Sequence, residues 1–261
     1  MIRIALTQLN PPETKEKSLE NIENYARLAS KNHADLVVFP EYYMCYYKGI
    51  KPADEAENIH GGYVQTLEKI SQKYKIDIIS GIHEKYENRI YDTAVYINKY
   101  SGISSYYRKT HLYDAFGFKE SDLYSHGNGP FDIFKINDFK IGMVICYDIR
   151  FPEIFRNYSL NSADLIVIIS GWFSGPVKEE QWLNLVSVRA LENTVYVASS
   201  NLVGGDFTGI STVADPIGVI INRCAEAPDI IYSDLDINRI RNVRNKMPVL
   251  EQRRPELYRL R

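Results

Sequence analysis

The chain has 261 residues, of which 45% are hydrophobic and 25% charged, proportions typical of a globular protein with a sizeable core. Its formal charge of -2 gives no basic surface for nucleic acid or an anionic membrane, and no uninterrupted apolar segment is long enough to span a bilayer. We therefore expect neither partner. The N-terminal segment Met1–Gln8 lacks the apolar core of a signal peptide, which predicts a cytoplasmic location.

Hydrophobic periodicity predicts strands alternating with helices in the first half of the chain. A strand at 2–8 is followed by a helix at 15–33, with Thr14 as its N-cap. The later elements of this half are a buried strand at 36–39, a helix around 64–74, a buried strand at 76–83, and paired strands at 90–98 and 103–108. Residues 113–130, rich in Gly, Asp, Ser and aromatic residues, are predicted to form a loop.

The second half of the chain continues this mixture of hairpins and helices. The predicted elements are paired strands at 131–136 and 139–145, a short helix after Pro152, a strand at 165–169, a helix at 177–193, strands at 194–200, 211–214, 218–221 and 230–235, and a helix at 236–246. No linker rich in Pro, Gly or Ser divides the chain. We therefore predict one domain over residues 1–246, a mixed β-sheet system covered by helices, and a charged tail at 247–261.

The cysteines argue against a disulfide framework and against a zinc site. Cys45, Cys146 and Cys224 are odd in number, widely spaced and form no CxxC pair. The five histidines are scattered as well, which disfavours a metal-dependent phosphoesterase. We expect no metal and no cofactor.

Three side chains with the chemistry of acyl transfer follow predicted strands, namely Glu41, Lys109 and Cys146. Because ligands bind at the carboxyl ends of strands in open sheets, these side chains can converge on one cleft. There Glu41 would take the thiol proton of Cys146, and Lys109 would stabilise first the thiolate and then an oxyanion. The backbone N–H of Tyr147 would give the oxyanion a second hydrogen bond.

Each of these residues also has an ordinary structural explanation. A buried cysteine is most often an inert core residue. A glutamate after a strand is usually a solvated loop residue or a helix cap, and Lys109 beside Arg108 is usual surface charge. Strand endings alone leave both interpretations open.

Three segments carry a more specific signal: Phe39-Pro-Glu41, Tyr107-Arg-Lys109-Thr-His-Leu-Tyr-Asp114 and Gly142-Met-Val-Ile-Cys146-Tyr-Asp-Ile-Arg-Phe-Pro-Glu153. In order and spacing they resemble the three signature blocks of the nitrilase (carbon-nitrogen hydrolase) superfamily, and the resemblance covers essentially the whole chain. It implies an α/β fold, an αββα sandwich of two mixed β-sheets with helices on the outer faces, whose protomers pair into an eight-layered dimer. It also implies that the catalytic Glu, Lys and Cys are Glu41, Lys109 and Cys146.

The resemblance implies further detail. A second family glutamate falls on Glu120, in a segment similar to omega-amidase-like members, with Asp122 as its local competitor. The segment Ser125-His-Gly-Asn128 departs from the Pro-Gly-Asp of many relatives, so the alignment of this loop stays open. The segment Cys146-Tyr-Asp-Ile-Arg150 resembles amidase-type members, either omega-amidase-like or deaminated-glutathione-amidase-like.

The activity implied is hydrolysis of a carbon-nitrogen bond other than a peptide bond. A small carboxamide would become a carboxylate and ammonia through a Cys146 thioester. Hydrolysis of a small nitrile and a non-catalytic binding role are the alternatives.

Four residues are candidates for contact with the substrate. Besides the backbone N–H of Tyr147, Arg150 either binds a substrate carboxylate or fixes the turn together with Asp148. Trp172 either narrows the pocket or simply packs, and Tyr47 lines the pocket or a dimer interface. The tail at 247–261 either ends in solvent or, as in the family it resembles, packs on a partner subunit, so we expect a homodimer or a higher homo-oligomer.

Overall fold

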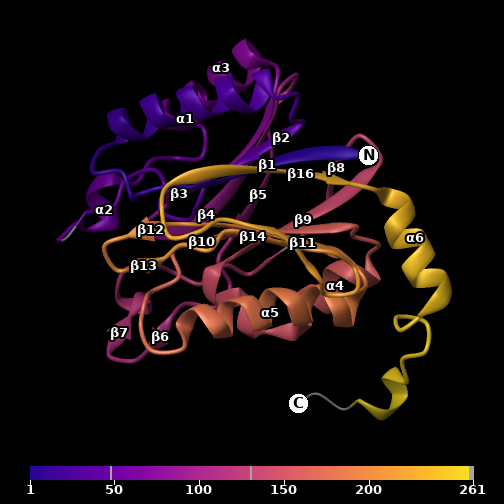
Figure 1. The fold of residues 1–261 in the computed structure, drawn as a ribbon. Helices are drawn as coiled ribbons and strands as arrows, with labels where there is room; N and C mark the ends of the chain where they lie inside the picture. The colour runs from indigo at the N-terminus through magenta and orange to yellow at the C-terminus, as the bar shows by residue number, and fades with distance from the viewer. Residues whose placement is uncertain (48, 130, 259–261) are drawn as a thin grey trace.

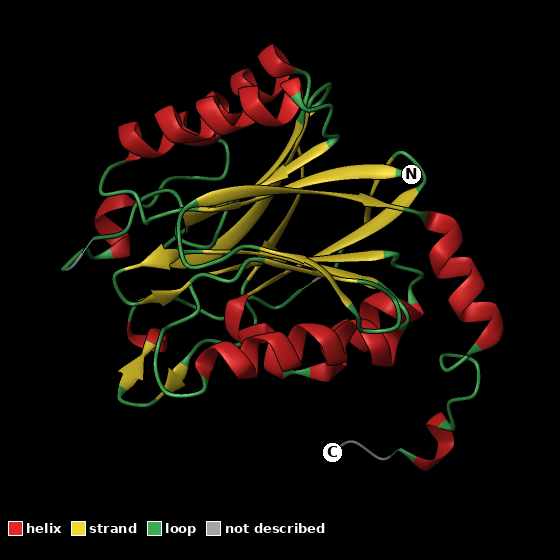
Figure 2. Ribbon diagram, viewed as in Figure 1, coloured by secondary structure: helices red, strands yellow, loops and turns green. Residues whose placement is uncertain are grey.

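The computed structural model describes residues 1–47, 49–129 and 131–258. Two six-stranded sheets lie face to face, and helices cover the two outer faces, as Figures 1 and 2 show. Each sheet contains both parallel and antiparallel pairs. The predicted αββα sandwich of two mixed sheets is therefore confirmed.

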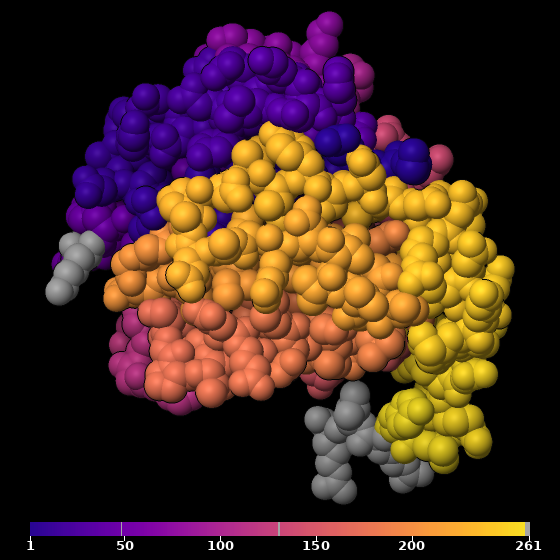
Figure 3. Space-filling view, in the orientation of Figure 1, coloured from indigo at the N-terminus to yellow at the C-terminus, as the bar shows by residue number. Residues whose placement is uncertain are grey.

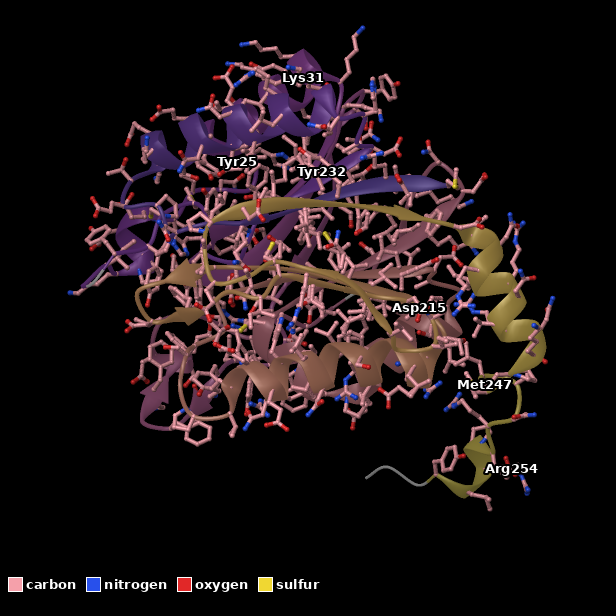
Figure 4. All side chains as sticks on the ribbon, viewed as in Figure 1. Tyr25, Lys31, Asp215, Tyr232, Met247 and Arg254 are labelled. Atoms are coloured by element: carbon pink, nitrogen blue, oxygen red, sulfur yellow. The ribbon has the colours of Figure 1, made fainter. Side chains whose placement is uncertain are left out.

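The first sheet is built from the N-terminal half of the chain and the last strand. Its order is β16 (Asp229–Leu235), β1 (Ile2–Gln8), β2 (Leu36–Val38), β3 (Asp77–Tyr86), β4 (Arg89–Asn98) and β5 (Gly102–Arg108). Helices α1 (Lys15–Lys31) and α3 (Gly62–Tyr74) pack on its outer face, and Tyr25 and Tyr232 pack against the core beneath α1 (Figure 4). The hydroxyl of Thr14 caps α1 by accepting a hydrogen bond from the Lys17 N–H at 3.2 Å, as predicted.

The second sheet is built from the C-terminal half. Its order is β15 (Ile220–Arg223), β14 (Thr212–Ala214), β11 (Tyr196–Asn201), β10 (Leu165–Ser170), β9 (Phe139–Ile145) and β8 (Phe134–Ile136). Helices α4 (Pro152–Leu160) and α5 (Lys178–Asn193) cover its outer face (Figure 1). All of β10 is buried, because its neighbours are parallel strands and both of its faces are covered.

The structure corrects several predicted elements. The segment 113–130, predicted as loop, contains a small hairpin of β6 (Asp114–Ala115) and β7 (Phe118–Lys119) and the 3-10 turn η1 (Glu120–Asp122). The strand predicted at 131–136 begins only at Phe134. Further short elements were not predicted, among them α2 (Pro52–Glu55), β12 (Val203–Gly204) and β13 (Phe207–Thr208). Elements of two to four residues are too short to show a hydrophobic period.

The C-terminal segment leaves the sandwich after α6 (Ile237–Lys246). The guanidinium of Arg239 on α6 donates to Asp215 at 2.8 Å, which ties this helix to the body. Beyond α6, the tail from Met247 through Arg254 projects at the edge of the molecule (Figures 3 and 4). Its last predicted residues, 259–261, lie outside the described residues. Within residues 1–47, 49–129 and 131–258, no helix has the length and hydropathy to cross a membrane.

His83 joins two loops from a buried position on β3. Its Nε2 lies 2.8 Å from the carbonyl oxygen of Cys45, which can only accept, so Nε2 carries the proton. The Nδ1 atom must then accept from the hydroxyl of Tyr124 at 2.9 Å. Burial lowers the pKa of His83 to about 4. The ring is therefore neutral near pH 7 and links the segment after β2 to η1.

The depressed pKa of His83 predicts a loss of stability in mild acid. The unfolded chain binds the proton near pH 6.5 and the native protein only near about 4, so the free energy of unfolding falls as pH drops through this window. We expect this residue to account for about 2 kcal/mol of loss between pH 7 and pH 5. Urea unfolding of the wild type and His83→Asn at both pH values measures it. The variant should be less stable at pH 7 but lose less on acidification, and equal losses would contradict the prediction.

Candidate active site

Lys109 lies at the centre of a cluster of buried charges. Its Nζ is 2.6 Å from Glu41 Oε1, 2.8 Å from Glu120 Oε1 and 3.5 Å from Asp92 Oδ2. None of these four side chains is more than 1% exposed. Glu41 follows β2, Asp92 belongs to β4, and Glu120 begins η1, so the fold must bring three separate segments to one ammonium.

The carboxylates keep the buried lysine charged. Burial alone would lower the pKa of Lys109, but the charges of Glu120, Glu41 and Asp92 hold it well above its ordinary value. Oxygens of the three acids also lie within 4.8 Å of one another, a spacing that suits a metal ion. The Lys109 ammonium already occupies the space between them, so the cluster is compensated by an amino group.

Glu41 is also held from the second sheet. The N–H of Gly171, directly after β10, donates to Glu41 Oε2 at 2.5 Å. Behind Glu41 lies Gly81 of β3, where an added Cβ would stand 2.9 Å from Glu41 Cα and 2.9 Å from the Tyr42 nitrogen. The close approach of these two backbones therefore requires glycine at position 81.

Cys146 begins a strained turn at the end of β9. Its φ of 42° lies in the left-handed region, which non-glycine residues rarely adopt, and it opens the 3-10 turn η2 (Cys146–Arg150). Cys146, Glu41 and Lys109 line one narrow pocket. Burial, reinforced by the charge of Glu41, raises the pKa of the thiol well above its ordinary value. The resting side chain is therefore a protonated thiol.

Asp148 fixes this turn from the inside. Its buried carboxylate accepts hydrogen bonds from the Ile145 N–H at 3.1 Å, the Tyr107 hydroxyl at 2.8 Å and the His111 N–H at 3.0 Å. Arg189 of α5 donates to the carbonyl of Ile149 at 2.8 Å. The structural explanation offered for Asp148 agrees with these contacts.

The surroundings of Glu120 and Asp122 differ sharply. Glu120 is buried and accepts from Lys109, from the Tyr113 N–H at 2.6 Å and from the Tyr42 hydroxyl. Asp122 is exposed and pairs with Lys119 at 2.9 Å. Of Glu120 and Asp122, only Glu120 therefore contacts the charge cluster around Lys109.

The predicted substrate contacts lie at two places. Trp172 lines the pocket of Cys146, and the guanidinium of Arg150 lies 4.9 Å from the centre of its ring. Tyr147 follows Cys146 in η2. Tyr47 instead is 44% exposed and lines a separate, larger cavity of about 570 Å³. The two cavities share Tyr42 and Phe173 as walls.

Two charged residues of the site, Asp92 and Lys178, were missed in the sequence. Lys178 lines the pocket with its Nζ 5.2 Å from the centre of the Trp172 ring, and burial together with the charge of Arg150 lowers its pKa. Asp92 had one usable signal, an acid inside an otherwise buried strand. Lys178 had none, because charged residues at the start of a helix look alike in sequence.

Gly81→Ala should strain the site without touching its side chains. The new Cβ would meet backbone atoms, which cannot rotate away, so we expect a loss of about 1–3 kcal/mol in the free energy of unfolding. Gly62→Ala is the matched control, because its Cβ meets only one atom, at 3.9 Å. Urea unfolding measures both, and we expect the control to be as stable as the wild type or slightly more so. Equal stability of the two variants would show that position 81 tolerates a side chain.

Comparison with known proteins identifies the family. A family model described as Carbon-nitrogen hydrolase matches residues 3–245. The chain is 32% identical to the omega-amidase NIT2 of Mus musculus over 267 residues, 98% of this chain and 96% of that protein. It is 30% identical to the deaminated glutathione amidase of Escherichia coli O157:H7 over 254 residues, 96% of this chain and 97% of that protein.

A solved structure supports the same family assignment. Nit3 of Saccharomyces cerevisiae, a member of branch 10 of the nitrilase superfamily, superposes with a TM-score of 0.87 at 29% identity, covering 97% of this chain and 96% of that one. The chain therefore belongs to the carbon-nitrogen hydrolase family, within the nitrilase superfamily that its three sequence blocks resemble.

Proposed function

We propose that the protein is an amidase that converts a small carboxamide into a carboxylate and ammonia through a Cys146 thioester. The observation that carries the proposal is the buried ammonium of Lys109, held by Glu41 and Glu120 in the pocket that Cys146 lines. Two relatives named as amidases favour an amide over a nitrile substrate. An inert Cys146 would have no need of three buried charges beside it.

In the first half of the proposed reaction, Glu41 takes the thiol proton while Sγ attacks the amide carbon. The raised pKa of the thiol makes this base necessary, because little thiolate exists at rest. The carbonyl oxygen becomes an oxyanion, stabilised by Lys109 and by the N–H of Tyr147. Glu41 then returns the proton to the leaving nitrogen, the carbon-nitrogen bond breaks, and ammonia departs.

In the second half, water attacks the thioester with Glu41 again as the base. The carbon-sulfur bond breaks, the thiol recovers its proton, and the carboxylate product leaves. Glu120 acts as a positioning residue, because it accepts from Lys109 at 2.8 Å and is itself fixed by Tyr113.

Cys146→Ala should abolish ammonia release from every amide tested. Lys109→Ala should lower kcat by at least ~10²-fold, by analogy with other oxyanion donors. Cys224→Ala is the control, because this thiol is also free and buried but lies outside the pocket. A panel of omega-amides, dipeptide-like amides and nitriles measures the rates. Activity in Cys146→Ala would refute the thioester, and turnover of nitriles alone would favour a nitrilase.

Two cations at the pocket edge favour a substrate that carries a carboxylate. Lys178 lines the pocket, and Arg150 lies on the same tryptophan ring. Both are held by neutral groups: Arg150 donates to Gln181 at 2.9 Å, and Lys178 to the Tyr113 hydroxyl at 3.5 Å. Their charges are thus available to an anion, and we propose an acidic amide as the substrate class.

Lys178→Met should raise the KM for an acidic amide about tenfold, the effect of losing one partly desolvated charge contact. A neutral amide of the same length should be affected far less, because it does not use the charge. Lys135→Met, an exposed lysine on β8, is the matched control for loss of charge. Steady-state kinetics with both amides measures the difference, and equal effects on the two substrates would speak against charge recognition.

The predicted homo-oligomer stays a prediction. Five large apolar side chains are exposed around α5 and β15: Val188, Leu191, Ile217, Val219 and Ile221. A patch of this kind on a single chain favours burial against a second copy. The projecting tail is the other candidate for such a contact.

A further inference from the structure

One buried acid has no part in the reaction as described. Asp92 lies on β4, directly opposite Lys109, whose N–H donates to its carbonyl at 2.9 Å. Its side chain is fully buried, with Oδ2 at 3.5 Å from Lys109 Nζ and within 4.8 Å of oxygens of Glu41 and Glu120. Among the residues that the structure describes, neither Asp92 oxygen has a hydrogen-bond partner. A buried carboxyl without partners needs an explanation.

The charges of the cluster do not balance if every acid is ionised. Three carboxylates would then surround one ammonium out of water, at a cost that no second cation in the described part of the chain offsets. Retention of one proton halves this excess of negative charge. It also turns two mutually repelling oxygens into the donor and acceptor of a hydrogen bond.

The contacts indicate which acid keeps the proton. Glu41 accepts from Lys109 and from the Gly171 N–H, and Glu120 accepts from Lys109, Tyr42 and the Tyr113 N–H. Donors of this kind stabilise the ionised form of a carboxyl. Asp92 receives none of them, and burial together with the charge of Glu41 raises its pKa well above the ordinary value.

We propose that Asp92 is a positioning residue that keeps its proton near neutral pH and donates it in a hydrogen bond to Glu41. The inference rests on the proposed function, in which Glu41 is the base. The bond would fix the Glu41 carboxylate towards Cys146. It would also place a neutral donor, in place of a second negative charge, beside Glu41.

Several other titratable groups face Asp92. They come from each neighbouring element: His83 on β3, Tyr42 after β2, Tyr124 after η1 and Lys109 after β5, besides the two glutamates, with Cys146 on the far side of the pocket. The pKa of His83 is about 4, and those of both tyrosines and the lysine lie well above their ordinary values. The charges of His83, of both tyrosines and of the lysine therefore do not change between about pH 6 and pH 9.

Comparison of Asp92→Asn with Asp92→Ala separates the effect of a hydrogen-bond donor at position 92 from the effect of a negative charge there. Asparagine keeps the shape and an N–H donor but cannot ionise, whereas alanine removes the donor. Two rates are measured from about pH 5 to pH 10: alkylation of Cys146 by iodoacetamide, followed by site-specific mass spectrometry, and hydrolysis of the best amide. Asp77→Asn is the matched control, because Asp77 is equally buried in β3 but bonds Tyr96 and the Lys99 N–H.

We expect Asp92→Ala to lower both rates at pH 7 at least about tenfold, the loss of one hydrogen bond to a charged group. Asp92→Asn should recover most of that loss. In the pH–rate profiles of Asp92→Asn, the alkaline limb should lie at higher pH than in those of the wild type, because no second carboxylate can form beside Glu41. Asp77→Asn should change neither of the two rates at pH 7 nor the alkaline limb of the pH–rate profiles.

Three results would overturn the inference: a loss in Asp92→Asn as large as in Asp92→Ala, an alkaline limb that does not move, or unchanged rates in Asp92→Ala. If Asp92→Ala does not fold, the rate and the alkaline limb of Asp92→Asn decide. The alkylation rate keeps the inference separate from the amidase proposal. A wild type that hydrolyses no amide, yet shows the expected alkylation profiles, would refute the amidase and leave the Asp92 hydrogen bond standing.

Discussion

A single ammonium buried out of water ties the catalytic cluster to the fold. An uncompensated buried charge costs several kcal/mol, so Lys109 is tolerable only when its acids are in place. Those acids come from positions 41, 92 and 120, which meet only after β2, β4 and η1 have assembled. The hydrogen bond from Gly171 to Glu41 adds the second sheet. The site is therefore a product of the completed sandwich and cannot form in one half of it.

The same charges have opposite effects on the two reactive groups. The acids that keep Lys109 protonated also disfavour a thiolate at Cys146, whose pKa is raised by burial and by Glu41. Lys109 offsets part of this penalty, since its charge favours the thiolate. The balance leaves a protonated thiol, which in the proposed reaction depends on Glu41 for its activation.

The sequence predicts the parts of this structure that show a sustained hydrophobic periodicity or a distinctive sequence motif. The strands at 139–145 and 165–169 and the helix at 177–193 show clear periodicity, and the structure has them within a residue or two. The strands of the hairpin within 113–130 are too short to show a hydrophobic periodicity. Glu120 and Asp122 cannot be separated by sequence, because only burial distinguishes them. Asp92 was missed although its strand was predicted, because the residues that surround its side chain belong to distant segments of the chain.

The buried charge cluster and the wall of the pocket are built from different parts of the fold. Glu41, Lys109 and Cys146, which carry the proposed reaction, are fixed by the two sheets. The wall is formed by the segments after β5 and β10, which carry Tyr113, Trp172 and the start of α5 with Lys178. Segments of this kind change more easily than strands because little backbone pairing depends on them. In the proposed amidase, the reaction class therefore follows from the buried charges, and the choice of substrate from the chemistry of these connecting segments.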